Sequence, residues 1–183
     1  MNYSAVILFK KNQASKKLAQ VQHSIAARFG GASAIRLPPH VTLAKWASKT
    51  SVREIFISAV GGITADFTIN MGPVELSVED KAIWYRVEES DGLLATAVHL
   101  AELLRLAGVK LENTTFSTRL HLTLAYKDYS ATQIAAIFES IQQMRLPEFV
   151  SLKAESIAVC QATSRGIWAV IGANRAQRNW HGS

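Results

Sequence analysis

The spacing of apolar residues along the chain predicts that strands and helices alternate. Short runs rich in β-branched and aromatic side chains are typical of strands, and they occur at residues 3–9, 149–161 and 167–171. Apolar residues that recur every three or four positions are typical of amphipathic helices, and they occur at residues 15–29, 52–60, 92–107 and 130–144. The stretch 67–88 is long enough for two or three strands, with breaks near Gly72-Pro73 and Glu79-Asp80.

Capping and turn residues set the expected limits of the helices. Ser15, Asp91 and Ser130 are suited to cap a helix N-terminus, whereas glycines end helices readily. The expected stops are Gly30-Gly31, Gly61-Gly62, Gly108 and Pro147. A turn is expected at 163–166, and the polar residues 173–183 are expected to be a frayed basic tail. No low-complexity tract or linker divides the chain, so residues 1–183 are expected to form a single domain.

The two halves of the chain repeat a similar order of elements. Each contains a strand or helix, then a strand with the pattern H-x-T-L, then a helix that opens with serine or threonine, then further strands. Such an order suggests an internal duplication. We therefore expect an α+β fold of two pseudo-symmetric lobes related by a pseudo-twofold axis. Two mainly antiparallel sheets would surround a central cleft, with helices on the outer faces.

The repeated tetrapeptide is the strongest chemical signal in the sequence. HVTL occupies residues 40–43 and HLTL occupies residues 121–124. Side chains at positions i and i+2 of a strand share one face, so His40 lies on the same face as Thr42, and His121 lies on the same face as Thr123. The apolar residues between them would face the helices. Both polar pairs are therefore expected to meet in one site with two symmetric sides.

Two imidazoles that face each other suit in-line displacement at phosphorus. A neutral histidine would remove a proton from the attacking water, and a protonated histidine would give one to the leaving oxygen; each transfer contributes roughly 10²–10⁴-fold. The threonine hydroxyls can donate hydrogen bonds to the phosphate oxygens as negative charge grows on them. A 2′,3′-cyclic phosphate suits this site because its ring already fixes the geometry. Either histidine can be the base, and no metal or other cofactor is required.

Two H-x-T motifs, each followed by a hydrophobic residue and separated by about eighty residues, resemble those of the 2H phosphoesterase superfamily. This superfamily includes 2′-5′ RNA ligase-like proteins and the cyclic phosphodiesterases of RNA and tRNA-splicing products. The resemblance covers nearly the whole chain in length and element order, but its specific part is the two tetrapeptides. It implies a bilobal fold with a central cleft and a catalytic set of His40, Thr42, His121 and Thr123. It also implies metal-independent hydrolysis of 2′,3′-cyclic phosphates, usually to 2′-phosphates.

The sequence departs from the RNA ligase-like branch next to the second motif. Many members of that branch carry a proline just before the second histidine and a basic residue soon after the motif, where this chain has Leu120 and Tyr126. A tyrosine at that distance is more similar to the small cyclic phosphodiesterases, whose substrates include ADP-ribose 1″,2″-cyclic phosphate. The departure argues against long RNA as the substrate.

Several residues near the motifs are further candidates for substrate contacts. Trp46 has the strand parity of His40 and could stack on a nucleobase, although a core tryptophan is an equally good interpretation. Lys45 and Lys127 flank the motifs and could attract phosphate, although exposed lysines more often serve solubility.

Three further positions depend on the details of the strands. Tyr126 is out of phase with His121 in a regular strand, so a bulge would be needed to bring it into the site. Arg119 has the parity of His121 and could meet the phosphate. Trp84-Tyr85 place one aromatic ring on each face of their strand, so one could line the cleft and the other the core.

The composition sets the remaining expectations about partners and location. The net charge of +6 favours anionic partners such as a nucleotide or an RNA end with a cyclic phosphate. Cys160 is the single cysteine, so no internal disulfide can form and a reducing cytoplasm is expected. Residues 1–11 lack the pattern of a secretory signal, and no apolar run reaches the roughly 18–20 residues that span a bilayer. A zinc site would need more ligands than the sequence offers, and a monomer is expected.

Two other functions stay open at this point. The same four residues could serve a phosphodiesterase that acts on 2′-5′-linked oligonucleotides or cyclic dinucleotides. Alternatively, a catalytically weak relative could use the basic cleft as a module that binds RNA or nucleotides.

Overall fold

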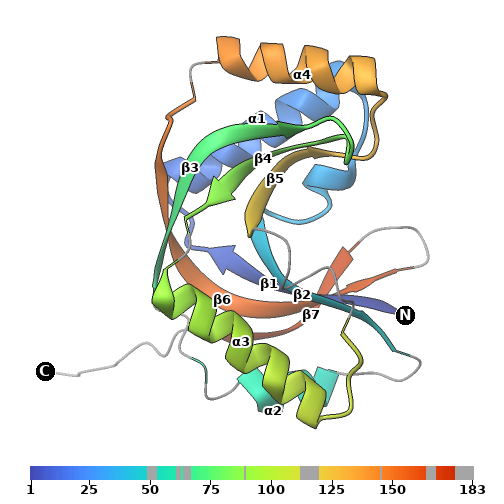
Figure 1. Cartoon of the computed structure of the whole chain (residues 1–183), viewed down its shortest axis with the longest axis vertical. Helices are drawn as coiled ribbons and strands as arrows, with labels where there is room; N and C mark the ends of the chain where they lie inside the picture. The colour runs from blue at the N-terminus through green and yellow to red at the C-terminus, as the bar shows by residue number, and fades with distance from the viewer. Residues whose placement is uncertain are drawn as a thin grey trace, which may run out of the picture.

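The computed structural model describes residues 1–48, 53–60, 63, 67–88, 90–111, 120–144, 146–163 and 168–175. Strands alternate with helices along most of these residues, and two pairs of strands follow each other directly (Figure 1). The strands are β1 (Asn2–Phe9), β2 (His40–Ala47), β3 (Thr68–Ser77), β4 (Ala82–Val87), β5 (His121–Tyr126), β6 (Val150–Ala162) and β7 (Trp168–Arg175). The helices are α1 (Gln13–Phe29), α2 (Arg53–Val60), α3 (Asp91–Leu106) and α4 (Ala131–Gln143), with a short 3-10 turn η1 (Ser33–Ile35).

The strand predictions are confirmed, with corrections at two places. The stretch 67–88 forms two strands, because β3 continues through Gly72-Pro73 with a shift in register between Met71 and Val74. A proline is tolerated there because the irregular pairing removes the need for its missing N–H. Strand β7 extends to Arg175, so the first three residues of the expected tail belong to a strand. The predicted stops at 61–62, most of the turn at 163–166 and residues 176–183 lie outside the described residues.

Two of the expected helix caps were wrong by a few residues. Asn12, not Ser15, caps α1; its side chain accepts a hydrogen bond from the Ser15 backbone, and Ser15 completes a capping box. Ser90, not Asp91, caps α3. In both cases a residue just upstream takes the extended conformation that a cap requires. Ser130 caps α4 as expected, and that helix ends at Gln143, before Pro147.

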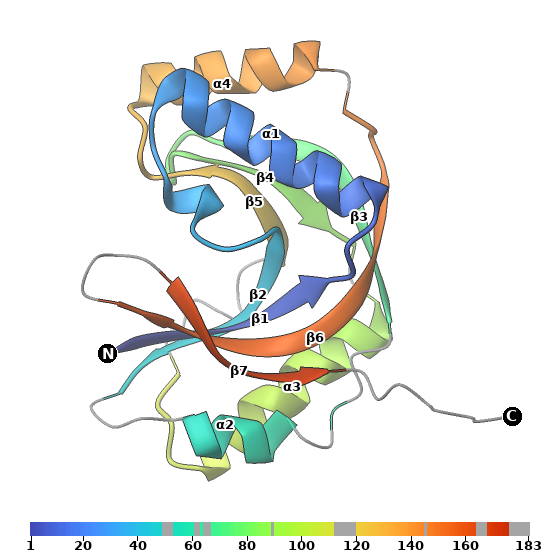
Figure 2. The same ribbon diagram turned by 180° about the vertical axis from the view of Figure 1, so that it is seen from behind.

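The strands form a continuous antiparallel sheet in the order β1-β2-β5-β4-β3-β6-β7. Strand β6 is long enough to belong to both lobes: its start pairs with β3, and its later part pairs with β1 and β7. On the other side, β2 pairs with β5. Figures 1 and 2 show β3, β4 and β5 in one lobe and β1, β2 and β7 in the other. The two expected sheets are therefore joined through β6 and the β2–β5 pair.

The helices cover the outer faces of the two lobes, as expected. Helices α1 and α4 lie over the lobe of β3, β4 and β5, whereas α2 and α3 lie against the other lobe (Figures 1 and 2). The order β1-α1-β2-α2-β3 is repeated as β4-α3-β5-α4-β6. Within the described residues, no helix is both long and apolar enough to span a bilayer.

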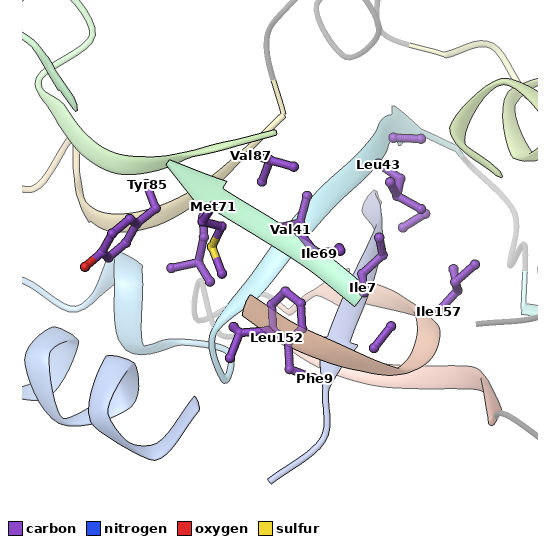
Figure 3. Close-up of a cluster of buried hydrophobic side chains, with 14 of the residues drawn as sticks. Ile7, Phe9, Val41, Leu43, Ile69, Met71, Tyr85, Val87, Leu152 and Ile157 are labelled. Carbon is purple, nitrogen blue, oxygen red and sulfur yellow. The ribbon is translucent and has the colours of Figure 1, made fainter. Parts of the chain in front are cut away.

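The hydrophobic core fills the space between the sheet and these helices. Figure 3 shows buried side chains from both lobes, among them Ile7, Val41, Met71, Tyr85 and Leu152. Because the core contains the apolar residues of both motif strands, it fixes which face of each strand is left for the polar residues.

Candidate functional site

The two motif strands pair at equivalent residues. Val41 of HVTL lies opposite Leu122 of HLTL in the antiparallel pair of β2 and β5. Continuing this register by one residue in each direction places His40 opposite Thr123 and Thr42 opposite His121. The local twofold axis of the pair therefore relates one motif to the other.

The burial pattern shows which face of these strands carries the polar side chains. The second and fourth residues of each motif are completely buried, whereas the four histidine and threonine residues are half-buried. His40, Thr42, His121 and Thr123 therefore lie on one face of two adjacent strands, which we call the site face. Because residues directly opposite in an antiparallel pair lie roughly 4.5–5.5 Å apart, the two H-x-T pairs form one cluster.

His40 is held in a defined tautomer. Its Nδ1 lies 2.8 Å from the carbonyl oxygen of Pro38, which can only accept a hydrogen bond. Nδ1 therefore carries the proton of the neutral ring, and Nε2 keeps its lone pair. Burial lowers the pKa of His40 below its ordinary value of 6.5; the bond to Pro38 opposes this effect, and the charges of Lys45 and His121 lower the pKa further. His40 is thus a neutral imidazole near pH 7.

A β-bulge follows the H-x-T triplet in both motif strands. Along β1, Ala5 lies opposite Ala44, but the next residue, Val6, lies opposite Thr42. Leu43 is therefore the extra residue of β2. Against β4, the same change leaves Leu124 as the extra residue of β5. Each extra residue is the fourth of its motif. From that point on, the alternation of faces along each strand is inverted.

The bulge in β2 decides the positions of Lys45 and Trp46. Trp46, which strict alternation placed on the site face, is completely buried in the core. Its ring stacks on Tyr3 with 5.8 Å between centroids and lies 6.5 Å from Phe56. The expectation that Trp46 stacks on a nucleobase is therefore wrong. Lys45 takes its place on the site face, where its charge acts on His40.

The bulge in β5 has the corresponding effect on Tyr126. Leu124 and Ala125 are both buried, and Tyr126 returns to the half-exposed face of His121 and Thr123. The bulge that the sequence required for this placement is present. Lys127 follows with a φ of 51°, and its Nζ lies 4.9 Å from the centre of the Tyr126 ring. A hydrogen bond to Tyr126 raises the pKa of Lys127, which is exposed. Arg119 lies outside the described residues.

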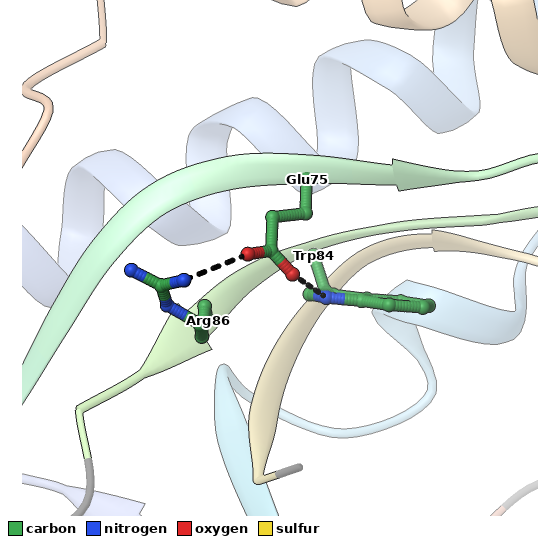
Figure 4. Close-up of polar contacts among 3 residues, drawn as sticks. All are labelled: Glu75, Trp84 and Arg86. Carbon is green, nitrogen blue, oxygen red and sulfur yellow. Dashed lines mark hydrogen bonds and ion pairs between the residues drawn. The ribbon is translucent and has the colours of Figure 1, made fainter. Parts of the chain in front are cut away.

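Three residues of β3 and β4 complete the site face. Trp84 lies opposite Thr123, and Arg86 lies opposite His121. The Trp84 ring contacts the His121 ring, with 4.9 Å between centroids and 35° between planes. Tyr85 points into the core instead. This agrees with the expectation that one ring of the Trp84-Tyr85 pair lies on each face of the strand. Glu75 of β3 contacts both Trp84 and Arg86 (Figure 4). Trp84 was foreseen only as one of two possibilities, and Glu75 and Arg86 carry no motif that could have identified them.

Two buried or partly buried anchors hold the motif strands in place. Gln22 of α1 is almost completely buried, and its side-chain nitrogen donates to the Thr123 carbonyl oxygen at 2.7 Å. Asp128, just after β5, accepts hydrogen bonds from the backbone N–H groups of Ala32 and Ser33 and from the Ser33 hydroxyl. Partial burial raises the pKa of Asp128, but these hydrogen bonds outweigh it and lower the pKa overall. The loop that leads into His40 is thereby attached to the end of the other motif strand.

Other features of the described residues that could carry chemistry do not belong to the site face. Cys160 is buried, and burial raises the pKa of its thiol to about 12, so it is not a nucleophile at neutral pH. In the part of the chain that the structure describes, no three His, Cys, Asp or Glu side chains are grouped so that they could hold a metal ion. A hollow of about 270 Å³ near the end of α4 is lined by residues such as Pro73 and Pro147 and contains none of the motif residues.

Comparison with solved structures shows which proteins share this fold. E. coli LigT, crystallised with 3′-AMP, is 14% identical, with a TM-score of 0.61, over 97% of this chain and 98% of LigT. The protein TT0787 of Thermus thermophilus is 17% identical, with a TM-score of 0.62, over 96% and 98% of the two chains. A protein described as a phosphoesterase is 14% identical, with a TM-score of 0.58, over 97% and 98%. The chain therefore has the LigT-like fold over nearly its whole length.

The sequence comparisons gave no match. No model of a protein family matches the chain, and no curated protein does so either. LigT has also been crystallised with NADP+, with ATP and with phosphate.

Proposed function

We propose that this protein is a 2H phosphoesterase that hydrolyses 2′,3′-cyclic phosphates to 2′-phosphomonoesters. The observation that supports this most strongly is the pairing of β2 with β5 at equivalent residues of the two motifs. It brings two histidines and two threonines to one face, which is the constellation that acid–base catalysis at phosphorus requires. The substrate would be a nucleotide, an RNA end or an ADP-ribose that carries a cyclic phosphate.

His40 is assigned as the general base and His121 as the general acid. The bond from Nδ1 of His40 to Pro38 leaves Nε2 available to accept a proton from water, and the lowered pKa keeps this ring neutral at pH 7. His121 would give its proton to the ribose 3′-oxygen as the bond from phosphorus to this oxygen breaks. The water oxygen becomes part of the 2′-phosphate, and the two histidines exchange protonation states in the course of one turnover.

The two motif threonines and the residues that follow the bulges would bind the phosphate. The hydroxyl groups of Thr42 and Thr123 would donate to its non-bridging oxygens, on which negative charge grows in the transition state. Lys45 and Tyr126 occupy equivalent positions after the two bulges and would contact the phosphate or the ribose from opposite sides. Lys127 adds positive charge at the rim. No step in this scheme requires a metal ion.

The fold and its nucleotide complexes support the same proposal. A LigT-like fold over nearly the whole chain agrees with phosphoesterase activity, and LigT binds 3′-AMP, NADP+ and ATP in crystals. A net charge of +6 favours such anionic ligands. We expect the protein to act as a monomer in a reducing cytoplasm, where the buried thiol of Cys160 stays reduced.

The direct test is hydrolysis of the four 2′,3′-cyclic nucleotides in the presence of EDTA, with the 2′- and 3′-phosphate products resolved. The 2′-phosphate is the expected product. His40→Ala and His121→Ala should each lower kcat by roughly 10²–10⁴-fold, the usual contribution of one proton transfer. Circular dichroism of each variant controls for folding.

Three results would contradict the proposal. One is turnover that persists in the double variant of His40 and His121. Another is activity confined to 2′-5′-linked oligonucleotides or cyclic dinucleotides, which would indicate the other phosphodiesterase specificity. The third is tight binding of nucleotides without product, which would indicate a binding module.

A further inference from the structure

The two sides of the pseudo-symmetric site have different neighbours. On β1, the residues opposite His40 and Thr42 are Leu8 and Val6. On β4, the equivalent residues opposite His121 and Thr123 are Arg86 and Trp84. The duplicated motifs are therefore flanked by aliphatic side chains on one side and by an aromatic and a charged side chain on the other.

The aliphatic neighbours on β1 help to explain why the pKa of His40 is lowered. Val6 is completely buried, and with Leu37, Ala158 and Cys160 it forms an apolar cluster against which Leu8 packs. An imidazolium beside such a cluster loses hydration and gains no polar partner from β1, which favours the neutral ring. The local environment of His40 thus suits a general base.

The side of His121 is a connected set of polar and aromatic contacts. The Trp84 ring lies 4.9 Å from the His121 ring between centroids. The Trp84 Nε1–H group donates to Glu75 Oε2 at 3.2 Å, and Glu75 Oε1 lies 3.3 Å from Arg86 Nη1 (Figure 4). The indole is therefore fixed at its nitrogen end by a carboxylate that is itself held by a guanidinium.

We propose that Trp84 is a positioning residue for His121: the indole face of Trp84 orients the imidazole ring of His121 and favours the protonated form of that ring. The inference rests on the proposed function, because it explains why His121 rather than His40 is the acid. An aromatic face attracts a cation through the negative potential above the ring, and the attraction is greatest for Trp. The neutral imidazole gains no comparable stabilisation, so the contact favours the proton on His121.

The other charges of the described site face do not account for this preference. Arg86 would disfavour an imidazolium, but Glu75 forms an ion pair with it and offsets its charge. The lowered pKa of His40 keeps that ring neutral at pH 7. Among the residues that the structure describes, the charged and titratable groups on the site face around His121 are His40 and Lys45 from β2, Glu75 from β3, Arg86 from β4, and Tyr126 and Lys127 at the end of β5. The aromatic contact is the feature of this set that specifically favours the cation.

The test compares Trp84→Leu, which removes the ring, with Trp84→Phe, which keeps an aromatic face but loses the hydrogen bond to Glu75. The pKa of His121 is measured by NMR titration, and the dependence of kcat and KM on pH is measured with a 2′,3′-cyclic nucleotide. His121 must be protonated to act, so activity falls as the pH rises through its pKa. In Trp84→Leu we expect this alkaline limb and the NMR midpoint to move to lower pH by about half a pH unit. We also expect kcat to fall several-fold with little change in KM.

In Trp84→Phe the titration midpoint of His121 should lie close to that of the unsubstituted protein. Tyr85 is the neighbouring residue that points into the core, and Tyr85→Phe should leave the midpoint unchanged. An unchanged midpoint in Trp84→Leu would overturn the inference. A rise in KM alone would also overturn it, because Trp84 would then bind the substrate base instead. The NMR titration needs no turnover, so it is read even if the proposed activity fails; loss of the proposed function is shown separately by the histidine variants.

Discussion

Lys45 and Trp46 show how one extra residue in a strand decides what reaches the site. Without the bulge at Leu43, the tryptophan would lie on the site face and the lysine would be directed at the core, where an unpaired charge is very costly. The bulge inverts this arrangement and buries Trp46 between Tyr3 and Phe56. The side chain on the site face is therefore a cation and not an aromatic ring.

Replacing Lys45 by Met should raise the pKa of His40, because the positive charge of Lys45 lowers it. His40 must be neutral to act as a base, so activity rises with pH through its pKa. The acid limb of the kcat/KM profile should therefore move to higher pH in Lys45→Met. The maximal kcat/KM should also fall roughly tenfold, as expected for the loss of one hydrogen bond to a charged group.

Lys17→Met is the matched control, because Lys17 is an exposed lysine of the outer helix α1. It should leave both the acid limb and the maximal rate unchanged. An acid limb that stays in place in Lys45→Met would show that Lys45 does not act on His40.

At this scale, the sequence predicted the residues within each motif but not those beyond it. Parity over three residues, from His40 to Thr42, depends only on the strand being extended. Whether Trp46 lies on the same face as His40 also depends on every intervening residue keeping the regular strand conformation. Neither Leu43 nor Ala44 is a residue type that indicates a bulge. Glu75 and Arg86 were missed for a similar reason, since their role comes from the register of β3 with β4 and β5.

The segment between α1 and β2 is the element that places His40. It begins with Gly30 and Gly31, both with positive φ angles, of 76° and 84°. At Gly31 a Cβ atom would lie 2.8 Å from Asp128 Cβ and from the Tyr129 ring, whereas at Gly30 it would meet open space. The close approach at Gly31 allows Asp128 to accept its hydrogen bonds from Ala32 and Ser33.

Gly31→Ala should therefore cost more stability than Gly30→Ala. Both substitutions force an L-residue to adopt a positive φ, at about 1–3 kcal/mol each. Gly31→Ala adds a steric clash, which raises its expected cost by about a further 1–3 kcal/mol. Because the clash displaces the segment that carries Pro38, it should also lower kcat, which Gly30→Ala should not. Urea unfolding and the cyclic nucleotide assay measure the two effects, and equal costs for the two variants would contradict the packing at Gly31.

The type and order of the elements could be predicted because their signals are local. Apolar spacing predicted each of the four helices of the described residues, and the caps were misplaced only where a second capping residue stood nearby, as with Asn12 and Ser15. The joining of the two lobes could not be predicted. It depends on β6 being long enough to pair with β3 at one end and with β1 and β7 at the other, which is a property of the assembled sheet.

At the scale of the whole molecule, the order of elements is duplicated, and a local twofold axis at Val41 and Leu122 relates the two motifs. Each half supplies one histidine and one threonine, so neither half contains the complete proposed site. The flanking strands then make the two sides unequal, with Val6 and Leu8 beside one motif and Trp84 and Arg86 beside the other. In the proposed mechanism, a symmetric scaffold holds one base and one acid in this way.

The most direct test of this account is a crystal structure of the protein with a nucleoside 2′-monophosphate, the proposed product. We expect one phosphate group within hydrogen-bond distance, roughly 2.6–3.2 Å, of Nε2 of both His40 and His121, with the hydroxyl groups of Thr42 and Thr123 on its oxygens. A phosphate that contacts one histidine while the other faces away, or that binds elsewhere on the molecule, would contradict the claim that both motifs act on one phosphorus atom.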